Sequence, residues 1–185
     1  MKKEIKIAVI GLGYVGLPLA RLFSTKYKTV GFDMSKARVD ALMQGHDATL
    51  EVADDLLQSA IANGFKCTAD VEEIRDYARN AIWYSHEWGG DDPIWFGLNQ
   101  GNGNCYVHAL VFQALLREKG YETMLIWVTD QSHYWNLVKI DGEWKHMDST
   151  PSPNYHERYS IMNDAMRAET LSGRDWDRTA WPAVN

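Results

Sequence analysis

The sequence predicts a chain of class α/β plus α+β, in which a parallel βαβ unit over residues 1–70 is joined to a helix-plus-antiparallel-sheet domain over residues 71–185. A glycine-rich turn follows a short apolar run near the N-terminus, as in a strand that leads into a helix. Further along, Cys105 opens an apolar helical segment, and Asp141-Gly142 separates two strand-like segments as a hairpin turn would. Most tryptophans and tyrosines lie in the second part, which indicates two pieces of different origin.

Composition excludes several classes of function. The chain has 185 residues, of which 45% are hydrophobic and 24% are charged, as in a soluble globular protein. A net charge of -6 argues against a nucleic-acid partner, because phosphate binding needs clustered Lys and Arg. Cys67 and Cys105 are too few for a disulfide framework or a four-ligand zinc site, so we expect no metal. No signal peptide or membrane-spanning run is visible, so we expect no membrane partner and take the cytoplasm as the default location.

The first part alternates strands and helices. Ile5 to Ile10 is a short apolar run that ends at Gly11, as expected of a buried parallel strand. The elements predicted after it are a helix over 14–24, a strand over 29–32, a helix over 36–44 capped by Ser35 and stopped by Gly45, a helix over 54–62 and a strand over 65–68. This order predicts a parallel sheet with helical crossovers.

The glycine turn predicts a nucleotide site. Gly11, Gly13 and Gly16 form a G-x-G-x-x-G pattern, which allows a tight turn and the close approach of a pyrophosphate to a helix N-terminus. Asp33 ends the second strand, where a carboxylate can accept hydrogen bonds from a ribose hydroxyl. These residues make NAD a possible cofactor. The alternative is that the glycines only permit tight packing.

This part resembles a known family. The segments IKIAVIGLGYVGLPLARLF, TVGFDMSKARVDALMQG and GFKCTADVEEIRD are similar to the start of the UDP-glucose/GDP-mannose dehydrogenase family, over residues 3 to about 76. The resemblance implies a Rossmann-like fragment with at most the adenosine end of an NAD site, and it does not imply a complete dehydrogenase. Cys67 does not match the catalytic cysteine motif of that family, so we expect a buried structural thiol.

The second part has a different pattern. We expect a helix over 71–83, a long loop over 85–103, a helix from Cys105 to about Lys119, strands over 121–129, 133–140 and 143–148, and a short helix over 160–168. The tryptophans of the C-terminal tail are expected to dock on the body of the domain.

The hairpin register predicts a catalytic triad. If Asp141-Gly142 is the turn, Ile140 pairs with Glu143, and His133 and Asp148 become diagonal neighbours on one face. Diagonal Cα atoms lie roughly 7–8 Å apart, within reach of an Asp–imidazole hydrogen bond. A slip of one residue would place the two side chains on opposite faces.

With Cys105, the chain has the order Cys, His, Asp. This order is typical of a thiol nucleophile, the base that activates it and the acid that orients the base. The N–H groups at a helix start favour a thiolate, and the backbone N–H of Cys105 would help to hold an oxyanion. His108 and His146 are rival bases that we rank below His133. The alternative for each residue taken singly is structural: Cys105 would be a small buried hydrophobic residue, and His133 and Asp148 would be ordinary polar residues of a strand and a turn.

This part also resembles a superfamily. Gly103 to Ala109 is similar to the G-x-C-aromatic-x-x-A motif of the transglutaminase-like superfamily, and HYW, GEW and DST at 133–135, 142–144 and 148–150 are similar to its H-x-W and G-x-W-x-x-x-D-x-T pattern. The resemblance covers residues from about 72 to 185. It implies a papain-like fold with Cys105 as nucleophile, His133 as base and Asp148 as the orienting acid. Calcium dependence is not carried over.

Three functions follow as hypotheses. The first is thiol-dependent acyl transfer or hydrolysis at amide bonds of a protein or peptide, by a transglutaminase-like or protease-like enzyme that needs no cofactor for the thiol chemistry. The second is a module that binds NAD or ADP-ribose without dehydrogenase activity. The third is a chimeric fusion of two fragments with little activity. A three-stranded parallel sheet leaves an edge uncovered, so a homodimer is a further possibility.

Overall fold

The computed structural model describes residues 5–151 and 160–185. It divides into two compact units, residues 1–70 and 71–185, which are described one at a time. Across the part of the chain that the structure describes, no helix has the length and apolar character needed to cross a membrane.

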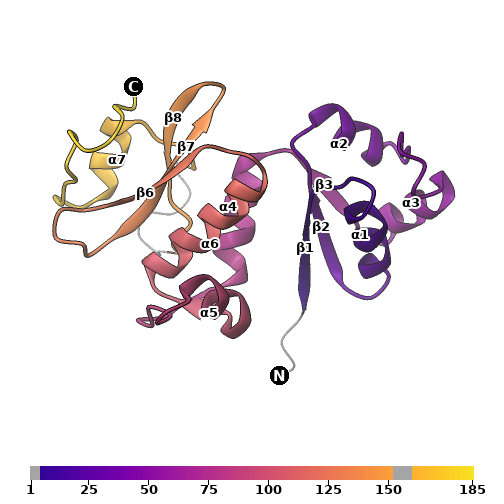
Figure 1. Ribbon diagram of the computed structural model, residues 1–185, viewed down its shortest axis with the longest axis horizontal. Coiled ribbons are helices and arrows are strands. Elements are labelled where there is room, and N and C mark those ends of the chain that lie inside the picture. Colours follow the sequence, from indigo (N-terminus) through magenta and orange to yellow (C-terminus); the bar gives the residue numbers. More distant parts are fainter. Residues whose placement is uncertain (1–4, 152–159) are drawn as a thin grey trace. The chain divides into compact units, whose positions relative to one another are not determined.

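The first unit is a three-stranded parallel sheet with helices (Figure 1). Its elements are β1 (Lys6–Ile10), α1 (Gly16–Ser24), β2 (Lys28–Phe32), α2 (Lys36–Met43), α3 (Asp54–Ala62) and β3 (Lys66–Thr68). The central strand is β2, which pairs in parallel with β1 on one side and β3 on the other. The parallel Rossmann-like arrangement expected from the sequence is confirmed.

Helix ends in this unit follow local chemistry. Ser35 caps α2, because its side chain accepts a hydrogen bond from the backbone N–H of Arg38. Gly45 and Gly64 follow α2 and α3 with positive φ values of 80° and 96°, which glycine adopts at little cost. Helix α1 begins at Gly16 and not at Tyr14, so the glycine turn extends two residues further than predicted.

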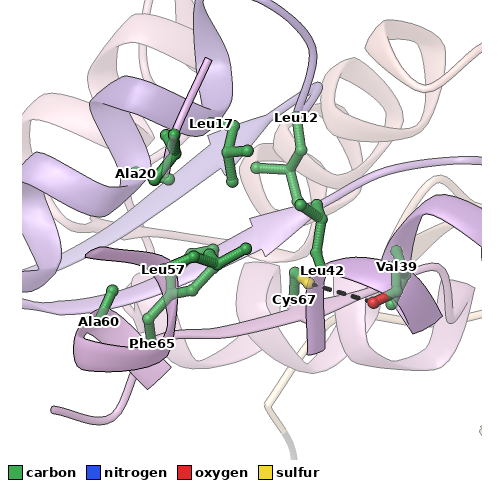
Figure 2. Close-up of a cluster of buried hydrophobic side chains, with 10 residues drawn as sticks. Leu12, Leu17, Ala20, Val39, Leu42, Leu57, Ala60, Phe65 and Cys67 are labelled. Carbon is green, nitrogen blue, oxygen red and sulfur yellow. Dashed lines mark hydrogen bonds between the residues drawn. The ribbon is translucent and has the colours of Figure 1, made fainter. Parts of the chain in front are cut away.

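One apolar core holds the first unit together (Figure 2). All three helices contribute to it, through Leu17 and Ala20 of α1, Val39 and Leu42 of α2, and Leu57 and Ala60 of α3. Cys67 belongs to this core, where its Sγ lies 3.8 Å from the carbonyl oxygen of Val39. Burial raises the pKa of the Cys67 thiol to about 11, as expected of a structural thiol.

The second unit is an antiparallel sheet between helices (Figure 1). Its elements are α4 (Val71–Ala81), β4 (Trp83–Tyr84), α5 (Pro93–Gln100), β5 (Asn102–Gly103), α6 (Cys105–Glu118), β6 (Thr123–Trp127), β7 (Tyr134–Ile140), β8 (Glu143–Met147) and α7 (Asp164–Thr170). The sheet order is β6-β7-β8. Helix α6 covers one face, and α7 with the C-terminal tail covers the other.

Side chains along β7 point alternately to the two faces of the sheet. Trp135 and Leu137 are fully buried and pack with Leu171, Trp176 and Val184 from α7 and the tail. The predicted docking of tail tryptophans is confirmed, since Trp176 is 4% exposed and meets the Trp135 ring edge-on at 5.8 Å.

The structure corrects two predicted segments. The long loop expected over 85–103 is wrong, because α5 and the short strand β5 lie within it. Asp92 caps α5 by accepting a hydrogen bond from Trp95 N–H, and Pro93 stands at the first helical position, where its missing N–H costs nothing. The last helix begins at Asp164 behind the cap Asn163, four residues later than the predicted start at Ser160.

Candidate functional site

Cys105 is the first residue of α6 and is 8% exposed. Asn104 caps this helix, because its side-chain oxygen accepts hydrogen bonds from the N–H groups of Tyr106 at 3.0 Å and Val107 at 3.2 Å. The first N–H groups of a helix have no partner within it. The cap serves the second and third of these groups, those of Tyr106 and Val107.

The chain enters α6 through a tightly packed segment. Gly103 lies against the first turn, and a side chain there would place its Cβ 2.5 Å from the Val107 side chain. The N–H of Asn104 donates to the carbonyl oxygen of Glu87 at 2.8 Å, and strand β5 pairs with β4. The glycine two residues before the cysteine is therefore required by packing, and the loop around it holds Cys105 in place.

The hairpin has the register predicted from the turn. Ile140 pairs with Glu143, and the ladder continues to Asn136 opposite Met147. Asp141 and Gly142 both have positive φ, as a two-residue hairpin turn requires. The register puts His133 and Asp148 together, with Nε2 of the imidazole 2.7 Å from Oδ2 of the carboxylate.

Cys105 and His133 also meet. The Cys105 thiol interacts with the imidazole of His133, and this interaction helps to raise the pKa of the ring. Because Nε2 faces Asp148, Nδ1 is the ring nitrogen left for the sulfur. The structure therefore brings His133 and Asp148 into contact and places the Cys105 thiol near enough to act on the ring.

Electrostatics favour a charged imidazole in this group. Burial opposes protonation of His133, but the charge of the Asp148 carboxylate, the hydrogen bond that this carboxylate accepts from the ring and the interaction with Cys105 outweigh it and raise the pKa to about 9. Burial likewise opposes ionisation of Asp148, yet His133, Arg167 and the Thr150 N–H hold its pKa well below the usual range. An imidazolium is the form of histidine that stabilises a neighbouring thiolate.

The sequence reasoning missed Arg167, which belongs to the site. Its Nη2 atom lies 3.1 Å from Oδ2 of Asp148, and its side chain is 4% exposed. Arg167 comes from α7, 19 positions after Asp148 in the sequence, so no hairpin or helix spacing links the two residues. Asn104 was missed as well, although an asparagine directly before an apolar helix is a recognisable capping signal.

The two rival histidines have other surroundings. His108 is fully buried on α6 and stacks near Tyr84, with ring centroids 6.5 Å apart. His146 accepts a hydrogen bond at Nδ1 from the Trp135 indole at 2.9 Å, and its Nε2 lies 2.7 Å from Asp164. Burial lowers the pKa of each ring to about 4, so both are neutral near pH 7.

The glycine turn of the first unit has the shape expected of a phosphate site. Gly11 has a φ of 85°, and a Cβ on Gly16 would overlap the carbonyl oxygen of Gly11. A Cβ on Gly11 or Gly13 would meet nothing within 4 Å, so the backbone of this turn is open on its outer side. No side chain caps α1, which leaves the positive end of the helix facing this space.

Asp33 lies at the same turn. Its Oδ2 accepts a hydrogen bond from the Leu12 N–H at 2.9 Å, and its Oδ1 accepts one from the Ser35 N–H at 3.0 Å. A carboxylate has about four acceptor sites, so both oxygens keep capacity for ribose hydroxyls. The open glycine turn and this carboxylate together fit the adenosine and pyrophosphate end of NAD.

Comparison with known families gives two family models that match different stretches of the chain. The model of the transglutaminase-like superfamily matches residues 54–149, just over half of the chain. The chain belongs to the transglutaminase-like superfamily. Cys105, His133 and Asp148 all fall within the matched segment of this transglutaminase-like chain.

A second family model, that of the NAD binding domain of the UDP-glucose/GDP-mannose dehydrogenase family, matches residues 5–82. The UDP-N-acetyl-D-glucosamine 6-dehydrogenase of Pseudomonas aeruginosa is 58% identical over 73 residues, and that of Salmonella typhi is 45% identical over 73 residues. Each match covers 40% of this chain and 17% of the relative. The transglutaminase-like chain thus carries a nucleotide-sugar dehydrogenase fragment and spans less than a fifth of those relatives.

The two family matches overlap over residues 54–82, whereas the structure divides at residues 70 and 71. Among solved structures, a protein from Cytophaga hutchinsonii provisionally described as a cysteine protease has 18% identity and a TM-score of 0.37. The matched region covers 50% of this chain and 33% of the Cytophaga hutchinsonii protein. Membership of the superfamily therefore rests on the family model and not on this structural likeness.

Proposed function

We propose that the second unit is a thiol enzyme that transfers or hydrolyses acyl groups at amide bonds of a protein or peptide. The observation that carries this proposal is the contact between His133 and Asp148, with 2.7 Å between imidazole and carboxylate, and the influence of the Cys105 thiol on the same ring. A thiol at a helix start, a raised imidazole pKa and a partly buried, ionised carboxylate support nucleophilic catalysis.

In the first half of the reaction, the Cys105 thiolate attacks the amide carbonyl carbon. A C–S bond forms, and the negative charge on the carbonyl oxygen is held in part by the Cys105 N–H. The His133 imidazolium then gives its proton to the departing nitrogen as the C–N bond breaks. An amine or ammonia leaves, and the acyl group remains on the sulfur as a thioester.

In the second half, neutral His133 takes a proton from water or from an acceptor amine as that nucleophile attacks the thioester. The C–S bond breaks, the acid or the new amide departs, and the thiolate–imidazolium pair is restored. Asp148 keeps the ring oriented throughout and stabilises its charged form, because its carboxylate stays ionised.

Alkylation by iodoacetamide tests the nucleophile, and Cys67 provides a control within the same molecule. Both cysteines are 8% exposed, but the pKa of about 11 makes the Cys67 thiol a poor nucleophile, so peptide mapping is expected to show Cys105 modified first. His133→Ala is expected to slow modification of Cys105 and leave Cys67 unchanged. Labelling of Cys105 no faster than that of a free thiol, and unaffected by His133→Ala, would refute the proposal.

The acyl acceptor is tested with a glutamine-containing peptide and a fluorescent primary amine. Mass spectrometry distinguishes the two products, since transamidation adds the amine to the peptide and hydrolysis converts the carboxamide to an acid. Cys105→Ala is the control that must abolish either product. A peptide cut at its backbone would assign the chemistry to proteolysis.

We also propose that the first unit binds NAD or ADP-ribose without dehydrogenase activity. The open backbone at Gly11 and Gly13, beside Asp33 and the uncapped start of α1, supports this second function. Gly11, Gly13 and Gly16 would hold the pyrophosphate and Asp33 the ribose, so the bound nucleotide would serve as a ligand and not as a hydride carrier. Calorimetry with NAD and with ADP-ribose tests the proposal, and an absence of binding at millimolar ligand would end it.

A further inference from the structure

Arg167 contacts the candidate triad from its far side. Its guanidinium reaches Oδ2 of Asp148, the same oxygen that faces the imidazole of His133. The guanidinium also lies over the ring of Trp135, with its central carbon 4.2 Å from the ring centroid. Trp135 is fully buried, so Arg167 is enclosed between an apolar ring and a carboxylate.

Helix α7 is fixed in place at a second point. Asp164, its first residue, lies 2.7 Å from His146, whose other ring nitrogen accepts a hydrogen bond from the Trp135 indole. An indole N–H is only a donor, so Nδ1 of His146 has no proton and Nε2 donates to Asp164. These contacts clamp α7 onto the sheet and hold Arg167 against Asp148.

We infer that Arg167 is a positioning residue, which holds the partly buried Asp148 carboxylate ionised and limits how strongly that carboxylate retains the proton on His133. The inference rests on the proposed function, because it concerns the same triad. If the Asp148 carboxylate were paired only with His133, its negative charge would stabilise the imidazolium without any opposing cation. Because the carboxylate also pairs with the permanent cation Arg167, the imidazolium is stabilised less and the ring can still release its proton.

The electrostatic environment agrees with this role. Arg167 lowers the pKa of Asp148 and also opposes the rise in the pKa of His133. Its charge is permanent, so the effect persists across the working pH range. Among the residues that the structure describes, other ionisable or charged groups around the site include Cys105, Tyr106 and His108 on α6, Arg79 on α4, Tyr84 on β4, Tyr134 on β7, His146 on β8, Asp164 on α7 and Arg178 in the tail.

An NMR titration of the His133 ring tests the inference without any substrate. Arg167→Gln and Arg167→Met remove the charge, and each is expected to raise the titration midpoint of His133 by roughly one pH unit. Arg167→Lys keeps the charge and is expected to restore the midpoint. Arg178→Met is the matched control, since Arg178 also lies 4.2 Å over a tryptophan ring but has Asp175 as its partner.

Three results would overturn the inference. One is a midpoint that stays or falls in the neutral variants, and another is an equal shift in Arg178→Met. The third is a midpoint in Arg167→Lys that rises by roughly one pH unit, because the positive charge would then not be what limits the pKa of His133. Arg167→Lys keeps the charge and tests the inference even if the neutral variants fail to fold. The titration needs no substrate turnover, so its result does not depend on the proposed amide chemistry. That chemistry is tested separately, by alkylation and product analysis.

Discussion

Nε2 of His133 lies 2.7 Å from Oδ2 of Asp148, although the two residues are on different arms of a hairpin. Each side chain is 17% exposed, so little water competes for this contact. The contact commits Nε2 to the carboxylate and leaves Nδ1 for the thiol, which fixes how the ring can act.

Asp148→Asn is expected to lower the pKa of His133 from about 9 to below its ordinary value of 6.5, because burial then acts on the ring without a compensating carboxylate. Alkylation of Cys105 at pH 8 should slow on the order of tenfold or more as the imidazolium is lost. Asp130→Asn, which changes an exposed carboxylate in the turn before His133, is the control. An unchanged alkylation rate in Asp148→Asn would contradict the assigned role.

Asn104→Ala removes the cap of α6. We expect the second unit to lose roughly 1 kcal/mol of unfolding free energy, because two N–H groups at the helix start lose their acceptor. Cys105 lies at the frayed end, so its alkylation should slow as well. Ser35→Ala removes the equivalent cap of α2 and should leave the Cys105 rate unchanged. Similar rates in both variants would show that the cap does not position the thiol.

The stability of the second unit is expected to peak near pH 6.5. The pKa of His133 is raised to about 9, so its contribution is complete below pH 6.5 and is lost as the pH rises through 9. The pKa values of His108 and His146 are lowered to about 4, so stability also falls as the pH drops from 6.5 toward 4. Each effect amounts to a few kcal/mol.

Urea unfolding followed by tryptophan fluorescence measures this profile. All eight tryptophans lie at or after Trp83, so the signal reports the second unit alone. His133→Gln should flatten the alkaline decline and leave the acid side intact. A profile that keeps rising above pH 8 would contradict the raised pKa of His133.

Gly16→Ala and Gly13→Ala separate folding from ligand binding in the first unit. A Cβ on Gly16 collides with the Gly11 carbonyl, so we expect a loss of roughly 1–3 kcal/mol and faster hydrogen exchange in β1 and α1. A Cβ on Gly13 meets nothing, so Gly13→Ala should keep native exchange protection and weaken NAD binding by calorimetry. An equal affinity for NAD in Gly13→Ala and the unmodified chain would show that the turn does not bind the nucleotide.

Local patterns predicted much of the fold correctly. Hairpin register followed from Asp141-Gly142, because a two-residue turn with both φ values positive dictates which residues pair. The parallel order of β1, β2 and β3 followed from strand–helix alternation. Prediction failed over 85–103, because a composition rich in glycine and aspartate suggested a loop while the Asp92-Pro93 helix start was overlooked.

The sequence by itself determined the three members of the candidate triad, the glycine turn with Asp33, and the presence of two parts. All of these depend on periodicity, turn chemistry and short motifs, which act over a few residues. Only the tertiary structure decided that Arg167 meets Asp148 and that His108 and His146 are buried and neutral. Burial and contacts between distant elements depend on how α7 and α6 pack on the sheet, and no local spacing encodes that packing.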